Sequence, residues 1–76
     1  REAIEMPYIS MECGALSDTQ KVELIQRLTQ TASEVMRVPQ EFFTVTIKEL
    51  PDLNFGIGGQ TIDKVKAEYM LKHQTI

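Results

Sequence analysis

The sequence lacks the residues on which several classes of protein depend. Its 76 residues include one cysteine, Cys13, one histidine, His73, and no tryptophan. A single cysteine excludes an intramolecular disulfide and a zinc site built from several thiolates, and it fits a reducing, cytoplasmic setting. We therefore predict a cytoplasmic protein without a metal site.

Long apolar runs and clusters of positive charge are also missing. No run approaches the roughly 20 apolar residues that cross a membrane, and no basic start with an apolar segment indicates a secretory signal. Eight Lys and Arg stand against eleven Asp and Glu, for a net charge of −3 with His73 neutral. Binding to nucleic acid needs clustered positive charge. We therefore expect neither a membrane nor a nucleic acid as partner.

The short chain limits how much surface folding can bury. A domain of about 60 residues buries only about 60% of the surface that its unfolded chain exposes. Small domains usually add disulfides, a metal or association with other chains. The first is excluded here and the second lacks a set of ligands, so we expect an oligomer. We expect residues 1–5 to be a non-native extension, with one domain over residues 6–76.

Two alternating segments flank a long helical pattern. Tyr8–Cys13 alternates apolar and polar side chains, which predicts a half-buried strand. Ser17 and Gln20 have the spacing of a capping box at the start of a helix predicted over Asp18–Arg37. Phe42–Leu50 alternates again and predicts a second strand. A strand, a helix of this length and a strand predict an α/β fold built on a βαβ unit with parallel strands.

The helix is expected to cover one face of the strand pair. Its predicted apolar stripe consists of Ile25, Leu28, Ala32 and Val35. The covered sheet face would carry Ile9, Met11, Cys13, Phe43, Val45 and Ile47. The other face would carry Tyr8, Ser10, Thr44 and Thr46. Two strands alone are not stable in water, so we expect other subunits to complete the sheet.

The C-terminal third begins with glycine-rich sequence. Asn54–Gly59 predicts a tight loop or short hairpin that places Phe55 and Ile57, and Thr61–Lys72 predicts a short helix. The run Gly56–Gly59 is not the dinucleotide fingerprint, because its spacing differs and it follows the second strand rather than the first. We therefore predict no cofactor.

Few residues offer acid–base chemistry. We interpret His73 as a solvated or lightly packed side chain and Cys13 as a buried, inert thiol. Pro7 differs, because removal of Met6 would turn its nitrogen into a secondary amine. An α-amine has a pKa of about 7.7–8.0, which an apolar or cationic site lowers, so it can act as a general base near neutral pH. The alternative is that Pro7 only starts a strand.

Four segments are informative when taken together in their order along the chain. They are Pro7-Tyr-Ile, the helix start Ser17-Asp-Thr-Gln-Lys21, the second strand near Thr44–Leu50, and Phe55-Gly-Ile-Gly-Gly59. In this order they resemble the 4-oxalocrotonate tautomerase family, from Pro7 to about Lys66. The resemblance implies a βαβ protomer with a C-terminal hairpin that assembles into dimers and commonly into hexamers.

The resemblance also implies an activity. Members of the family move a proton between carbon atoms of an enol or dienol acid, and the amino-terminal proline is the base. Pro7 matches that proline, and Phe55 matches the loop aromatic residue that lowers its pKa. Ile57 would line the same pocket. The implied partner is therefore a small enol or 2-oxo acid substrate.

Two arginines of the family, which hold the substrate carboxylate and polarise its carbonyl, have no counterpart here. The first falls on Ala15 or Leu16, because this segment is one residue shorter, and the second falls on Thr44. Lys48 or Lys66 is a candidate point charge, although a lysine does not reproduce the arginine fork, and the alternative is that both are solvated surface charges. We expect a monoacid or neutral enol rather than a diacid dienol.

Three hypotheses stay open at this point. The first is a tautomerase with an altered substrate range, which Pro7 and the apolar loop favour. The second is a proline-dependent hydratase, dehalogenase or decarboxylase that acts on unsaturated acids. The third is a non-catalytic oligomer that keeps the fold, which the missing arginines favour.

Overall fold

The computed structural model describes residues 6–73. Residues 1–5, where we expected an extension, and residues 74–76 lie outside this range. The elements in order are β1 (Tyr8–Cys13), α1 (Asp18–Met36), the 3₁₀ helix η1 (Gln40–Phe42), β2 (Thr44–Glu49), the 3₁₀ helix η2 (Asp52–Asn54), β3 (Gly56–Ile57), β4 (Gln60–Thr61) and α2 (Ile62–Lys72).

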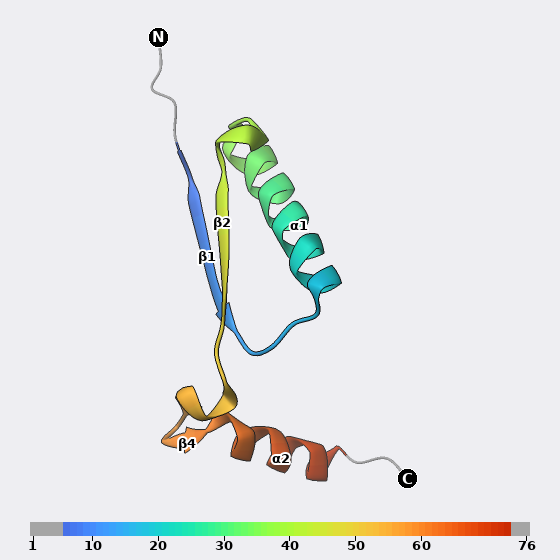
Figure 1. Cartoon of the computed structure of the whole chain (residues 1–76), viewed down its shortest axis with the longest axis vertical. Helices are drawn as coiled ribbons and strands as arrows, with labels where there is room; N and C mark the ends of the chain where they lie inside the picture. Colours follow the sequence, from blue (N-terminus) through green and yellow to red (C-terminus); the bar gives the residue numbers. More distant parts are fainter. Residues whose placement is uncertain (1–5, 74–76) are drawn as a thin grey trace.

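The parallel strand pair is confirmed. Strands β1 and β2 run side by side in register, from Tyr8 beside Thr44 to Cys13 beside Glu49. Helix α1 lies along β2, whereas α2 lies across the far end of the molecule, beyond the ends of both strands (Figure 1). Strand β2 begins at Thr44 rather than Phe42, because the chain first forms the 3₁₀ turn after Pro39.

Helix α1 begins with the predicted capping box. The Gln20 amide donates to Ser17 Oγ at 3.1 Å, and the Ser17 amide donates to Gln20 Oε1 at 2.9 Å. These two bonds satisfy amides that have no partner inside the helix. The helix ends at Met36, one residue earlier than predicted, because Arg37 takes a left-handed conformation with φ of 60°. The Arg37 amide then donates to the Ser33 carbonyl at 2.8 Å.

The predicted apolar stripe of α1 is partly wrong. The half-buried side chains are Lys21, Leu24, Leu28, Thr29, Ala32 and Ser33. Ile25 is 41% exposed and Val35 is 77% exposed, so neither packs on the sheet. At the helix start, the ion pair between Lys21 and Glu49 at the end of β2 lies on the same side as this half-buried row.

The glycine-rich segment forms the predicted short hairpin. Strands β3 and β4 pair antiparallel, and the turn between them places Gly58 at φ of 61° and Gly59 at 87°. Two positive φ values in succession are typical of a two-residue hairpin turn that matches the twist of the strands. The following helix α2 packs on η2, β3 and β4.

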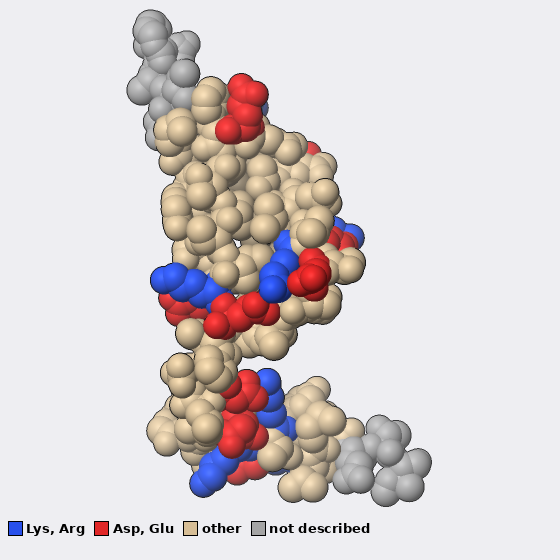
Figure 2. Space-filling view, viewed as in Figure 1, with Lys and Arg blue, Asp and Glu red and all other residues tan. Residues whose placement is uncertain are grey.

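One protomer is more extended, and exposes more surface, than a compact folded chain of its length. Its radius of gyration is 17.2 Å, whereas a compact chain of this length has about 11 Å. It exposes 6324 Å², compared with about 4,700 Å² for a folded monomer of this mass. Within residues 6–73 no side chain is fully buried. Figure 2 shows a broad area without charge over the upper part of the strand pair and α1.

Candidate functional site

Pro7 and Thr44 lie together at one end of the strand pair. Pro7 is half-buried directly before β1, and its carbonyl accepts a hydrogen bond of 3.1 Å from the Thr44 amide. Tyr8, which is 64% exposed, faces Thr46 across the strands, and their hydroxyl oxygens are 3.2 Å apart. The backbone at the proposed base is therefore fixed to β2 while the side chains beside it stay accessible.

The other predicted site residues lie toward the opposite end. Lys48 is in register with Glu12 near the end of the pair. Because a strand advances about 3.3 Å per residue, the far end of β2 is about 16 Å from Thr44. Within one protomer, the predicted site residues therefore form two groups that lie toward opposite ends of the strand pair. The first group is Pro7 and Thr44, and the second is Leu16, Lys48, Phe55 and Ile57.

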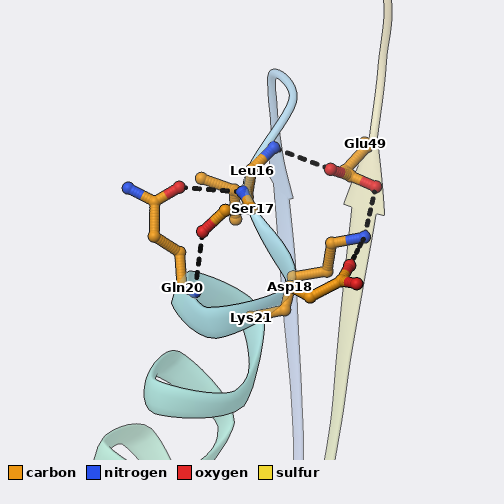
Figure 3. A network of polar contacts seen from close by, with 6 residues as sticks. All are labelled: Leu16, Ser17, Asp18, Gln20, Lys21 and Glu49. Carbon is orange, nitrogen blue, oxygen red and sulfur yellow. Dashed lines mark hydrogen bonds and ion pairs between the residues drawn. The ribbon is translucent and has the colours of Figure 1, made fainter.

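Leu16 belongs to a polar network at the start of α1 (Figure 3). Its amide donates to Glu49 Oε2 at 2.7 Å. The Lys21 ammonium lies 3.0 Å from Glu49 Oε1 and 3.8 Å from Asp18 Oδ1. The Leu16 amide, followed by Lys21, holds the pKa of Glu49 below its ordinary value, and the hydrogen bond to Glu49 raises the pKa of Lys21. The network therefore stays charged at neutral pH.

An open cavity of about 300 Å³ lies on the flank of α1. It is lined by Leu16, Gln20, Glu23, Leu24 and Arg27. Arg27 forms an ion pair with Glu23 one turn earlier. Neither Arg27 nor Glu23 was among the predicted site residues, although their spacing of four residues is a common signal for a pair on one helix face. Of the predicted site residues, Leu16 is the one that lines this cavity.

The two candidate lysines have different surroundings. The Lys66 ammonium lies 3.0 and 2.9 Å from the two oxygens of Asp52, and this pair lies against Gly14. Lys66 therefore joins α2 to η2. Lys48 is exposed on β2 and forms no ion pair with any residue in the range 6–73.

The remaining candidates occupy separate places. Phe55 is half-buried, and its carbonyl accepts from the Ile62 amide at 3.0 Å, whereas Ile57 is 62% exposed on the hairpin. Cys13 is a free thiol and is half-buried rather than fully buried. His73 is exposed and stacks on Tyr69 with ring centres 4.0 Å apart, which agrees with a lightly packed side chain.

Neither a metal site nor a membrane-spanning helix is found in the described part of the chain. Residues 6–73 contain no cluster of three or more His, Cys, Asp or Glu side chains placed to hold a metal ion. The helices of the same range are too short or too polar to cross a membrane.

Comparison with known proteins identifies the family. A model of the tautomerase enzymes matches residues 7–64. The chain belongs to the tautomerase family. A 2-hydroxymuconate tautomerase from Pseudomonas sp. strain CF600 is 36% identical over 50 residues, which cover 66% of this chain and 79% of that protein. The corresponding enzyme of Pseudomonas putida is 39% identical over 49 residues, covering 64% and 78%.

Solved structures of tautomerases share the fold. The crystal structure of apo unfused 4-oxalocrotonate tautomerase superposes with a TM-score of 0.70 at 34% identity, over 76% of this chain and 95% of that one. TomN, a homologue from the tomaymycin biosynthetic pathway, gives 0.77 at 26% identity, over 80% and 95%. The resemblance to the 4-oxalocrotonate tautomerase family is therefore confirmed. So is the α/β fold, with a parallel strand pair, a long helix and a short C-terminal hairpin. At the level of the family, the tautomerase is an isomerase-type enzyme.

Proposed function

We propose that this tautomerase converts an enol or dienol acid to its keto form, with the nitrogen of Pro7 as general base. The observation that supports this most directly is the position of Pro7. It is the first residue of the matched segment, it precedes β1 directly, and its carbonyl is held by Thr44. A base fixed in this way keeps one geometry toward the substrate, which is what efficient proton transfer requires.

The chemistry needs Pro7 at the amino terminus. Inside a chain its nitrogen is an amide without a basic lone pair, whereas at the terminus it is a secondary amine. The amine takes the proton of the enol hydroxyl group, and its protonated form then delivers a proton to a carbon atom of the substrate. The exchange consumes no net proton and needs no cofactor.

The site is proposed to draw on more than one protomer. Pro7 and Thr44 lie about 16 Å from the strand end that leads to Leu16, Phe55 and Ile57, so one protomer does not bring them together. A homo-dimer or hexamer that completes the sheet would place one group beside the other group of a neighbour. The proposed partners are therefore copies of this chain and a small enol or 2-oxo acid.

Lys48 is the preferred cation of this site. Lys66 is engaged by both oxygens of Asp52, whereas Lys48 is exposed on the same sheet face as Thr44. A single ammonium holds one carboxylate less directionally than an arginine fork. This favours a monoacid or neutral enol over a diacid. A cytoplasmic location without nucleic-acid or membrane partners stays a prediction from composition.

The decisive experiment compares two forms of the protein with phenylenolpyruvate as substrate. A form that starts at Pro7 should turn over the enol, whereas the form that carries residues 1–5 and Met6 should show little or no activity. Equal, robust rates in both forms would refute the role of Pro7. Background rates in both, with 2-hydroxymuconate as well, would favour the non-catalytic oligomer.

A further inference from the structure

The start of α1 differs from the usual pattern in a way that involves Leu16. Leu16 precedes the capping residue Ser17, and Lys21 is the fourth residue of the helix. In many helices these two positions carry apolar side chains that contact each other and fix the angle at which the chain enters the helix. Here the second position is a lysine, so this apolar contact is not available.

Glu49 links the two positions instead. One of its oxygens accepts from the Leu16 amide at 2.7 Å, and the other lies 3.0 Å from the Lys21 ammonium (Figure 3). Because each oxygen has its own partner, the carboxylate cannot rotate without losing one of them. Both bonds are charge-assisted, and the side chains of Lys21 and Glu49 are each only 34% exposed. Glu49, at the end of β2, thus holds the loop between β1 and α1.

The loop that Glu49 holds carries a side chain that lines a cavity. Leu16 is half-buried and forms the cavity wall together with Leu24 of α1 and the Arg27 side chain. A shift of the Leu16 backbone would therefore move the cavity wall. Glu49 does not line the cavity, so its effect there passes through Leu16.

We propose that Glu49 is a positioning residue that fixes Leu16 and thereby sets the width of the substrate pocket. The proposal rests on the proposed function, in which Leu16 lines the pocket of a neighbouring Pro7. Loss of Glu49 should weaken the binding of substrate and leave proton transfer by Pro7 unchanged.

Three variants separate the parts of this network, and a fourth is the control. Glu49→Ala removes both bonds. Glu49→Gln keeps an oxygen for the Leu16 amide but removes the charge that faces Lys21, and Lys21→Met removes only the cation. Glu34→Gln removes one exposed negative charge on α1 away from the network.

The first measurement is hydrogen exchange of the Leu16 amide by NMR, in the full assembled protein. Glu49→Ala should accelerate exchange by about tenfold or more, since a hydrogen bond to a charged group is being removed. Glu49→Gln should give a smaller increase, and Glu34→Gln should match the parent protein. Unchanged exchange in folded Glu49→Ala would overturn the proposal. If that variant fails to fold, exchange in Glu49→Gln and Lys21→Met decides instead.

The second measurement is the affinity for phenylpyruvate, the 2-oxo acid formed from phenylenolpyruvate, in the Pro7-started protein. Glu49→Ala should weaken binding by about tenfold, and Glu34→Gln should not. Where the protein is active, KM should rise in parallel while kcat and the pH–rate profile stay within error. The proposal would be overturned if Glu49→Ala accelerates exchange but does not weaken binding. It would also be overturned if the parent protein does not bind phenylpyruvate at millimolar concentration.

These outcomes separate this proposal from the proposed function. The parent protein could be inactive and still bind phenylpyruvate, with an affinity that falls in Glu49→Ala. This result would contradict the tautomerase chemistry and support the role of Glu49. The parent protein could instead be active, with an affinity that does not change in Glu49→Ala. This result would support the tautomerase chemistry and contradict the role of Glu49.

Discussion

Glu49 carries two different bonds, and this makes its ionisation part of the stability of the fold. The pKa of its carboxyl lies below 4.5, because the Leu16 amide and then Lys21 stabilise the charged form. A lowered pKa gives stability that is present at neutral pH and is lost as the pH falls through the folded-state value. The raised pKa of Lys21 gives stability that is lost only as the pH rises above 10.5.

The first prediction at this scale concerns acid stability. The melting temperature of Glu49→Gln should lie below that of the parent protein at pH 7, and the difference should shrink as the pH falls below about 4.5. Melting followed by circular dichroism across this range tests it, with Glu34→Gln as the charge-matched control. A difference that stays constant down to the acid end would contradict the assignment.

The second prediction concerns the missing arginines. Leu16→Arg together with Thr44→Arg in the Pro7-started protein should raise kcat/KM for 2-hydroxymuconate more than for phenylenolpyruvate. Each charge-assisted contact contributes on the order of 1.5–3 kcal/mol, or roughly 10- to 100-fold. Steady-state kinetics with both substrates measures the ratio. An equal gain for both substrates would show that the arginines do not act on the second carboxylate.

At the scale of elements, the β3–β4 hairpin depends on glycine for two separate reasons. Gly58 and Gly59 have positive φ, whereas Gly56 faces the neighbouring strand so closely that a Cβ would lie 2.5 Å from the Gln60 carbonyl oxygen. Atoms do not approach at that distance without a shift of the backbone.

Gly56→Ala should therefore displace the hairpin that carries Phe55 and Ile57. We expect a loss of unfolding free energy of about 1–3 kcal/mol, in the range of a strained core substitution. The matched control is Gly14→Ala, where the added Cβ would meet its nearest atoms at ordinary distances of 3.9 and 4.0 Å. Chemical denaturation of both variants tests this. A loss as large in Gly14→Ala would mean that the close approach at Gly56 is not the cause.

The elements themselves were largely predictable, because their signals are local. The capping box at Ser17 and the alternation in Tyr8–Cys13 depend on neighbouring residues, and both predictions are confirmed. The orientation of α1 was not predictable in the same way. Ile25 and Lys21 both fit a helical repeat with the half-buried residues of α1. Lys21 faces the sheet and contacts Glu49, which lies 28 residues later in the sequence, and local spacing does not reveal such a contact.

The sequence predicts the candidate site as a set of residues, and their arrangement in space comes from the structure alone. Local sequence indicated Pro7, Phe55 and Ile57, and the resemblance assigned them roles. Their separation along the strand pair follows from the parallel register, which places the start of β1 beside the start of β2. The sequence alone also left Lys48 and Lys66 equivalent. They differ because α2 brings Lys66 to Asp52.

At the scale of the whole molecule, the protomer extends 58 Å along its longest axis and has no fully buried side chain in residues 6–73. Exposed apolar residues occur on both helices and on the hairpin. Examples are Val35 at 77%, Leu71 at 73% and Ile57 at 62%. Apolar side chains at this exposure add to stability only when another surface covers them.

Folding and association should therefore be one process. The melting temperature should rise with protein concentration, because each added subunit stabilises the folded state by mass action. Thermal melts between roughly 1 and 100 μM, together with sedimentation velocity, test this. A melting temperature independent of concentration, with a folded species of 8.7 kDa, would contradict it.

The separation of Pro7 and Thr44 from Leu16 and Phe55 along the strand pair has a genetic consequence. If each site takes one group from each of two subunits, two differently damaged chains can complement each other. We consider two variants of the protein that starts at residue 7. One carries Pro7→Ala and the other carries Phe55→Ala, and each should be poorly active alone. Refolded together, they should recover part of the parent activity, because some mixed assemblies contain one undamaged site. Such complementation would be impossible if every chain carried a complete site of its own.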